Sequence, residues 1–106
     1  MINNVAPLPS PRLCSCAMLY NGLIYIVGGG SYDYYTGDGA IYTFNPITKE
    51  VTRLATKLKE EYGSSIFSVV GNRVYSFGGI ASSYQTLYAF NTIQVFDAAT
   101  NSTFIL

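Results

Sequence analysis

The fold is decided by the stretch NGLIYIVGG at residues 21–29, which occurs again as GNRVYSFGG at residues 71–79. The tyrosines at the centre of the two copies, Tyr25 and Tyr75, are 75 − 25 = 50 positions apart. Self-similarity at a spacing of about 20 to 50 residues is the sequence signature of repeat architectures. We therefore expect two copies of one structural unit.

The similarity extends in both directions from this stretch. Downstream, IYTFNPITKEVTRL at residues 41–54 aligns with IQVFDAATNSTFIL at residues 93–106, at an offset of 106 − 54 = 52. Upstream, residues 13–20 align with residues 63–70. The second copy is longer in the loop after the diglycine, where insertions cost little free energy.

Each copy predicts four short strands joined in a meander. Asn21-Gly22 and Gly71-Asn72 are two-residue hairpin signals, because Gly and Asn accept the positive φ that a tight turn requires. Asn45-Pro46 and Asp97-Ala98 mark the turn before each fourth strand. The predicted strands cover residues 14–20, 23–27, 40–44 and 51–54 in the first copy and residues 64–70, 73–77, 93–96 and 103–106 in the second.

One segment also fits an amphipathic helix. Its apolar residues fall at helical spacing, at positions 47, 51, 54, 55 and 58. The matching segment of the second copy, residues 100–106, shows no such period. Because two copies of one repeat share a structure, we expect a strand over residues 51–54 and a charged loop over residues 55–62.

These motifs resemble the kelch repeat. The resemblance rests on Pro11-Arg12, on Gly22 to Gly29 and on Phe44 to Thr48, and it extends from about Pro9 to Leu106. It implies an all-β fold in which residues 1–106 are an incomplete propeller made of two four-stranded antiparallel kelch-type blades. Blade 1 would cover residues 11–54 and blade 2 residues 62–106.

The chain departs from the kelch pattern at two places. The tryptophan that usually opens the fourth strand is replaced by Val51 and Thr103, and the chain has no tryptophan at all. We expect each site to leave room or to be filled by a neighbour such as Phe104. The second copy also has Tyr62 at the position of Arg12.

Two blades do not make a closed propeller, because each blade hides its faces only against neighbours and about four to eight blades are usual. We therefore expect either further kelch blades from a longer chain or a homo-oligomer. Residues 5–9 fit the exit from the last strand of a preceding blade.

Charge and hydropathy argue against several partners. Six basic and six acidic residues give a formal net charge of +0, so neither a nucleic acid nor an anionic membrane is expected as a partner. Apolar runs such as residues 23–27 are far shorter than the roughly 20 residues of a membrane span. No signal peptide is recognisable, since no basic region precedes Pro7, Pro9 and Pro11.

Cys14 and Cys16 are the only cysteines. On one strand their Cβ atoms would be roughly 6.6 Å apart, which is too far for a relaxed disulfide. A metal site would need more ligands, and the chain has no histidine. We expect two small buried thiols in a reducing compartment, and hence a cytoplasmic protein.

Catalytic chemistry finds little support in the residues. Gly28-Gly29-Gly30 is not followed by the Gly-Lys-Ser/Thr of a phosphate loop. Asp33 and Asp38 are a pair of carboxylates in a glycine-rich loop with nothing to fix their geometry. A copper site of the kind found in some kelch oxidases needs histidine. We expect no catalytic residue, no metal and no cofactor.

The loops after the two diglycines have the composition of a recognition surface. Tyrosine offers a large, rigid and amphipathic contact area, and Ser, Gly and Asp adapt their hydrogen bonds. The kelch resemblance places these loops and the joins between blades on one face. The residues expected to contact a partner protein are Arg12, Tyr32, Asp33, Tyr34, Tyr35, Tyr62 and Tyr84.

The predicted function is that of a protein–protein interaction module, a fragment of a kelch scaffold or adaptor. The alternative is a sugar-binding or sugar-converting propeller, an oxidase or an epimerase, in which the aromatic loops would stack on pyranose rings. Tyr25 and Tyr75 lie inside predicted strands and are expected in the core.

Overall fold

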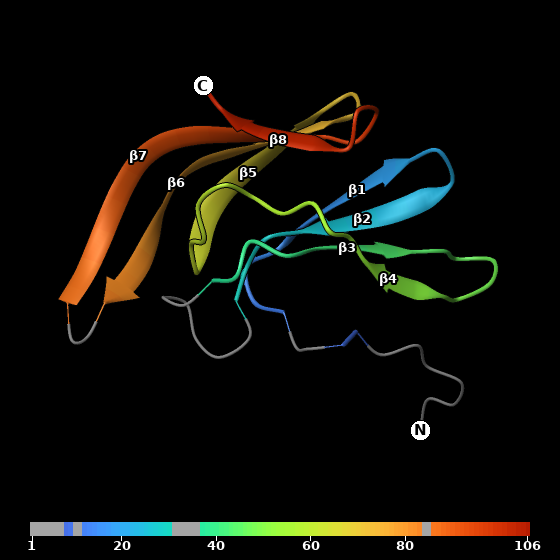
Figure 1. The fold of residues 1–106 in the computed structure, drawn as a ribbon, viewed down its shortest axis with the longest axis horizontal. Coiled ribbons are helices and arrows are strands. Elements are labelled where there is room, and N and C mark those ends of the chain that lie inside the picture. The colour runs from blue at the N-terminus through green and yellow to red at the C-terminus, as the bar shows by residue number, and fades with distance from the viewer. Residues whose placement is uncertain (1–7, 10–11, 31–36, 84–85) are drawn as a thin grey trace.

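The computed structural model describes residues 8–9, 12–30, 37–83 and 86–106 (Figure 1). These residues form two four-stranded antiparallel sheets and no helix, which confirms the all-β prediction and excludes the helical alternative near residue 50. The N-terminal sheet contains β1 (Cys16–Tyr20), β2 (Leu23–Val27), β3 (Ile41–Phe44) and β4 (Val51–Arg53). The C-terminal sheet contains β5 (Ser64–Val70), β6 (Arg73–Ser83), β7 (Thr86–Asp97) and β8 (Ser102–Ile105).

Both sheets are meanders, and their turns use the predicted chemistry. Asn21 and Gly22 have positive φ values of 53° and 80° in the β1–β2 turn. In the β3–β4 turn, the side-chain oxygen of Asn45 accepts hydrogen bonds from the amides of Ile47 and Thr48. Asp97 accepts the matching pair of bonds in the C-terminal sheet. The side chains that we expected to form turns therefore do so in both copies.

The second and third strands of the C-terminal sheet are longer than predicted. The register of β6 against β7 shifts between Phe77 and Gly79, and pairing then continues as far as Ser83 and Thr86. Gly78, with a φ of 62°, allows this bulge. In the N-terminal sheet, β2 instead ends at Val27. Positions 80–83 and 86–88 thus belong to a long hairpin and not to a loop.

The core lies between the two sheets. Val27 and Ile41 of the N-terminal sheet are buried in one cluster with Val74 and Phe96 of the C-terminal sheet. The rings of Tyr25 and Phe96 meet across this boundary with 5.7 Å between their centroids. Both tyrosines are half-buried. Tyr25 packs against the core as expected, whereas Tyr75 stacks on Phe77 of its own strand.

Leu58, in the segment that connects the sheets, is buried in the same cluster. Its amide donates to the carbonyl of Gly39, next to the N-terminal sheet, with an N···O distance of 2.9 Å. The neighbouring carbonyl of Lys57 accepts a 2.8 Å hydrogen bond from the hydroxyl of Thr103 on β8. The connecting segment is therefore bonded to both sheets.

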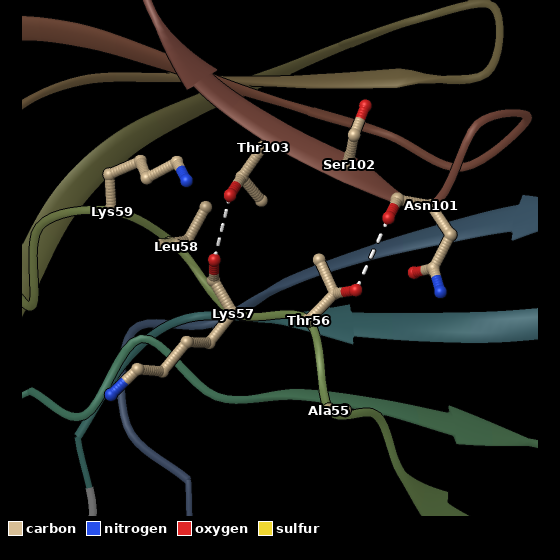
Figure 2. A pocket seen from close by; sticks show the side chains of 8 residues that line it. All are labelled: Ala55, Thr56, Lys57, Leu58, Lys59, Asn101, Ser102 and Thr103. Atoms are coloured by element: carbon tan, nitrogen blue, oxygen red, sulfur yellow. Dashed lines mark hydrogen bonds between the residues drawn. The ribbon is translucent and has the colours of Figure 1, made fainter.

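A hollow lies where the kelch pattern would place tryptophan on the fourth strand. It has a volume of about 460 Å³, and the hydroxyl of Thr103 lines it while bonding to Lys57 (Figure 2). Of the two outcomes that we expected at this position, the site beside Thr103 leaves room, and Phe104 does not fill it. Neighbouring residues of a strand point to opposite faces, and the guanidinium of Arg73 lies 5.7 Å from the centre of the Phe104 ring.

The cysteines differ from the prediction in one respect. Both are free, but Cys14 is exposed and lies outside β1, with a positive φ of 58° that interrupts the predicted strand. Cys16 is half-buried, and burial raises the pKa of its thiol. Within the described residues there is no helix with the length and hydropathy of a membrane span.

Replacing Leu58 with Ala should destabilise the chain by about 2 to 5 kcal/mol, because the side chain fills the boundary between the sheets. Chemical denaturation followed by circular dichroism measures this loss. Ile47→Ala is the matched control, since Ile47 is exposed in the β3–β4 turn and should change stability by less than about 0.5 kcal/mol. Equal losses for the two variants would contradict the assignment of Leu58 to the core.

Replacing Thr103 with Trp should raise the melting temperature, because the indole gains apolar contact in the hollow beside Leu58. Thr103→Val keeps the size of the side chain but leaves the Lys57 carbonyl without its hydroxyl donor. That variant should lose about 0.5 to 1.5 kcal/mol. A lower melting temperature for Thr103→Trp than for Thr103→Val would mean that the hollow does not accept the ring.

Candidate functional site

The structure describes two of the seven residues expected to contact a partner, Arg12 and Tyr62. The other five predicted contact residues lie outside the described residues: Tyr32, Asp33, Tyr34, Tyr35 and Tyr84. The described residues on either side of segment 31–36, Gly30 and Gly37, do have a defined setting. We call the described residues on both sides of segment 31–36 the base of the segment.

Backbone bonds fix the start of the segment. Leu13 and Gly30 form an isolated antiparallel bridge, with N···O distances of 2.7 Å and 3.0 Å. Gly29, the residue before this bridge, has a φ of 86°, and a Cβ there would collide with the backbone of Leu13. The first diglycine is thus needed for close approach of two chain segments.

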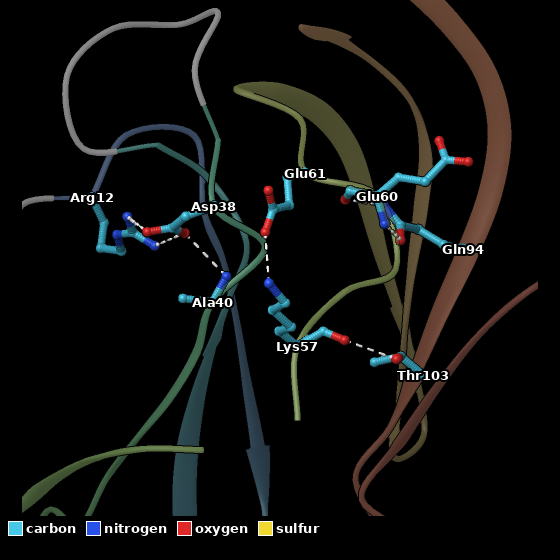
Figure 3. Close-up of polar contacts among 8 residues, drawn as sticks. All are labelled: Arg12, Asp38, Ala40, Lys57, Glu60, Glu61, Gln94 and Thr103. Carbon is cyan, nitrogen blue, oxygen red and sulfur yellow. Dashed lines mark hydrogen bonds and ion pairs between the residues drawn. The ribbon is translucent and has the colours of Figure 1, made fainter. Parts of the chain in front are cut away.

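An ion pair between a buried arginine and a partly exposed aspartate lies just after the segment. The guanidinium of Arg12 donates two hydrogen bonds to the carboxylate of Asp38, at 2.8 Å and 2.9 Å (Figure 3). The Arg12 side chain is 4% exposed, and its guanidinium carbon also lies 5.5 Å from the centre of the Tyr42 ring. A bidentate pair of this kind holds both groups in one geometry. Arg12 therefore positions the base of the segment.

The pKa of Asp38 is lowered in the folded chain. Its partial burial would by itself raise the pKa. The hydrogen bonds from Arg12 and from the amide of Ala40, together with the charges of Arg12 and Arg53, outweigh that effect. Asp38 therefore stays ionised at a lower pH than an ordinary aspartate does, and the ion pair with Arg12 persists at neutral pH.

Tyr62 takes the place of Arg12 in the second copy, and it is also buried. Its ring stacks on Phe90 with 4.8 Å between centroids, and its hydroxyl lies 2.6 Å from the hydroxyl of Thr92. A Cβ at Gly79 would fall 2.5 Å from the Tyr62 ring, so the second diglycine makes room for it. We expected Tyr62 to face a partner, but the structure turns its ring inward because this pocket of backbone and aromatic surface receives it.

We call Arg12 and Tyr62 the two anchors. The residues that they contact, Asp38 and Phe90, also occupy matching positions of the repeat. Phe90 follows Asp38 by 90 − 38 = 52 positions, which is the offset of the second half of the repeat. The ion pair of the first copy is thus replaced by an aromatic stack in the second. Sequence reasoning missed this pairing, although the joint change from Arg and Asp to Tyr and Phe was visible in the aligned copies.

The two anchors lie next to each other. A Cβ at Gly37 would collide with the carbonyl group of Tyr62, so Gly37 packs directly against the backbone that leads into β5. Gln94 binds that backbone too, because its amide exchanges two 3.0 Å hydrogen bonds with the main chain of Glu60 (Figure 3). The backbone of residues 60–62 therefore connects the base of the segment to the C-terminal sheet.

An apolar hollow of about 400 Å³ adjoins this region. It lies across the start of β5 and the bulge of β6, and Phe77 and Phe90 on its wall are partly exposed. The full lining is Ser64, Ser65, Ile66, Phe77, Gly78, Gly79, Ile80, Ala89 and Phe90. Among the residues that the structure describes, no three His, Cys, Asp or Glu side chains gather as metal ligands would.

The described residues define an all-β protein of two antiparallel four-stranded sheets. Comparison with models of protein families finds no match, and comparison with curated protein sequences finds none either. Among solved structures, the chain is similar to one described as "Structure of YjhT", with a TM-score of 0.69 and 24% sequence identity. The similarity covers 92% of this chain and 28% of that chain, and at this identity it shows the fold alone.

Replacing Asp38 with Asn should cost about 1 to 3 kcal/mol at neutral pH, because the buried Arg12 guanidinium loses its anionic partner. The pKa of Asp38 is lower in the folded chain than in the unfolded chain. The stabilisation that the carboxylate gives to the folded chain is therefore complete above a pH of about 4 and is lost as the pH falls through the folded pKa. Melting curves measured between neutral and strongly acidic pH should therefore converge for the wild type and Asp38→Asn.

The control for this prediction is Glu61→Gln. It removes an exposed carboxylate that is 2.9 Å from Lys57, and such surface pairs contribute little. Its melting temperature at neutral pH should match that of the wild type. A wild type and an Asp38→Asn variant that remain equally far apart at acidic pH would show that the ionised carboxylate is not what stabilises the base.

Proposed function

We propose that the two sheets are kelch-type propeller blades and that the chain binds a partner protein at the base of segment 31–36. The observation that carries this proposal is the clamp on both sides of the segment, made by the Leu13–Gly30 bridge and the Arg12–Asp38 pair. Support for the blade assignment comes from the matched four-stranded meanders and from the similarity to a much longer chain.

The clamp matters because ordering a loop opposes binding. Each side chain immobilised at an interface costs about 0.5 to 1.5 kcal/mol, and a segment with fixed ends has less freedom to lose. The described residues on either side of Tyr32, Tyr34 and Tyr35 are held by the Leu13–Gly30 bridge and the Arg12–Asp38 pair before any partner binds. Tyrosine on a rigid scaffold is the residue type that most often supplies interface energy.

Replacing Tyr32, Tyr34 and Tyr35 together with Ala should weaken partner binding by about thirtyfold or more, because truncating one central aromatic residue costs about 2 kcal/mol. Partners are first captured by the wild type and identified by crosslinking and mass spectrometry. Affinity for each purified partner is then measured by calorimetry. The melting temperature should hardly change, since the clamp is intact.

Two control variants separate binding from folding. The triple change to Phe keeps the three rings and should retain most of the affinity, whereas Tyr25→Ala should lower the melting temperature because Tyr25 packs on Phe96. Normal affinity of the triple Ala variant would contradict the proposal. So would saturable binding on a glycan array with no protein partner, which is the result that a sugar-binding propeller predicts.

A further inference from the structure

The two sheets pack against each other through different faces. The N-terminal sheet buries Met18, Val27 and Ile41 against the C-terminal sheet. At the offsets of the repeat, Val27 and Ile41 correspond to Phe77 and Ile93. Phe77 is paired with Ile66 and Ile93 in the cross-strand register, so these three residues share one face of the C-terminal sheet. We call this face the outer face of the C-terminal sheet.

This outer face is exposed at Ile66 and Phe77. Phe77 is 40% exposed although its counterpart Val27 is 0% exposed, and Ile66 on the same face is 73% exposed. The residues directed toward the N-terminal sheet, such as Val74 and Phe96, alternate with them and are buried. The C-terminal sheet therefore presents to solvent the face that the N-terminal sheet uses for packing.

The N-terminal sheet shows the complementary arrangement. Val74 and Phe96, both buried, correspond to Ile24 and Phe44, which are only half-buried. Ile24 and Phe44 are cross-strand partners, and Ile24 also pairs with Leu19, which is 70% exposed. These three residues define the outer face of the N-terminal sheet. It corresponds to the face of the C-terminal sheet that is already covered.

We infer that the outer face of the C-terminal sheet binds the outer face of the N-terminal sheet of a second copy of this chain. The sheet boundary inside the molecule is the template, because it joins these same two kinds of face. Arg73 and Asp97 at the edge of the C-terminal face are paired at 3.0 Å. On the N-terminal face, the guanidinium carbon of Arg53 lies 5.9 Å from the centre of the Tyr42 ring. The contact is head-to-tail, and such contacts continue from copy to copy until a ring closes.

Leu8 gives separate support for this arrangement. It precedes the first copy of the repeat as Leu58 precedes the second, at a separation of 58 − 8 = 50. Leu58 is buried between the two sheets, whereas Leu8 is only half-buried. In the head-to-tail contact, Leu8 of the second copy takes the position between sheets that Leu58 takes within the chain. This inference goes beyond the proposed partner binding and does not depend on it.

The test is the mass of the chain in solution, measured by sedimentation over a wide range of concentrations. The wild type should associate, and Leu19→Arg and Ile66→Arg should each be reduced to single chains, because each variant charges one of the two outer faces. Both side chains are exposed, so circular dichroism and melting curves should show an intact fold. Ile47→Arg, in an exposed turn away from both faces, should associate like the wild type.

Mixing the two variants tests the direction of the contact. Ile66→Arg keeps the outer face of the N-terminal sheet and Leu19→Arg keeps that of the C-terminal sheet, so the mixture should form a complex of one chain of each. Association of Leu19→Arg alone would show that like faces bind, and a mixture that stays as single chains would exclude the pairing. A folded wild type that is a single chain at every concentration would overturn the inference.

The tyrosine segment provides a check that keeps the two proposals apart. The triple change of Tyr32, Tyr34 and Tyr35 to Ala leaves both outer faces intact and should not alter the mass of the wild-type assembly. Loss of partner binding with normal association would support both proposals. Loss of association in that variant would place the contact between copies at the segment and would contradict the face-to-face arrangement.

Discussion

The structure depends on the burial of one sheet face against the opposite kind of face of its neighbour. A four-stranded meander has two faces, and a single neighbour can cover only one of them. Leu58 completes this boundary, because its side chain lies among the buried residues of both sheets while its backbone bonds to the N-terminal sheet. The connecting segment holds the two sheets at this boundary through its bonds to Gly39 and Thr103.

The anchors show how one position in a repeat accepts two chemistries. In each copy, a side chain before the first strand reaches across to the segment that follows the diglycine. The first copy uses an arginine and an aspartate, and the second uses a tyrosine and a phenylalanine. A serine hydroxyl meanwhile bonds the first glycine carbonyl in both copies, from Ser15 and Ser65. The backbone geometry is therefore kept while the side-chain interaction changes from electrostatic to aromatic.

The local signals of the sequence were enough for most of the fold. The bounds of β2 and β5 agree with the prediction, because turn residues mark the ends of these strands. The extension of β6 could not be predicted, since a glycine with positive φ either ends a strand or allows a bulge. The burial of Tyr62 was missed for a different reason: it depends on Phe90, which only the folded chain brings beside it.

The repeat also connects assembly with recognition. A second copy that binds through the outer faces would place its N-terminal sheet beside the C-terminal sheet of the first copy, as the two sheets lie within one chain. The connections between the second and third strands of all the sheets would then lie at the same end of the assembly. The clamped bases of segment 31–36 from successive copies then share that end. For a partner that carries two linked binding segments, binding at one base would raise the effective concentration of the second segment at the next base, so that overall avidity would exceed the affinity of a single base without any new contact. The packing constraint that leaves one face of each sheet open would in this way also determine how strongly the loop end holds its partner.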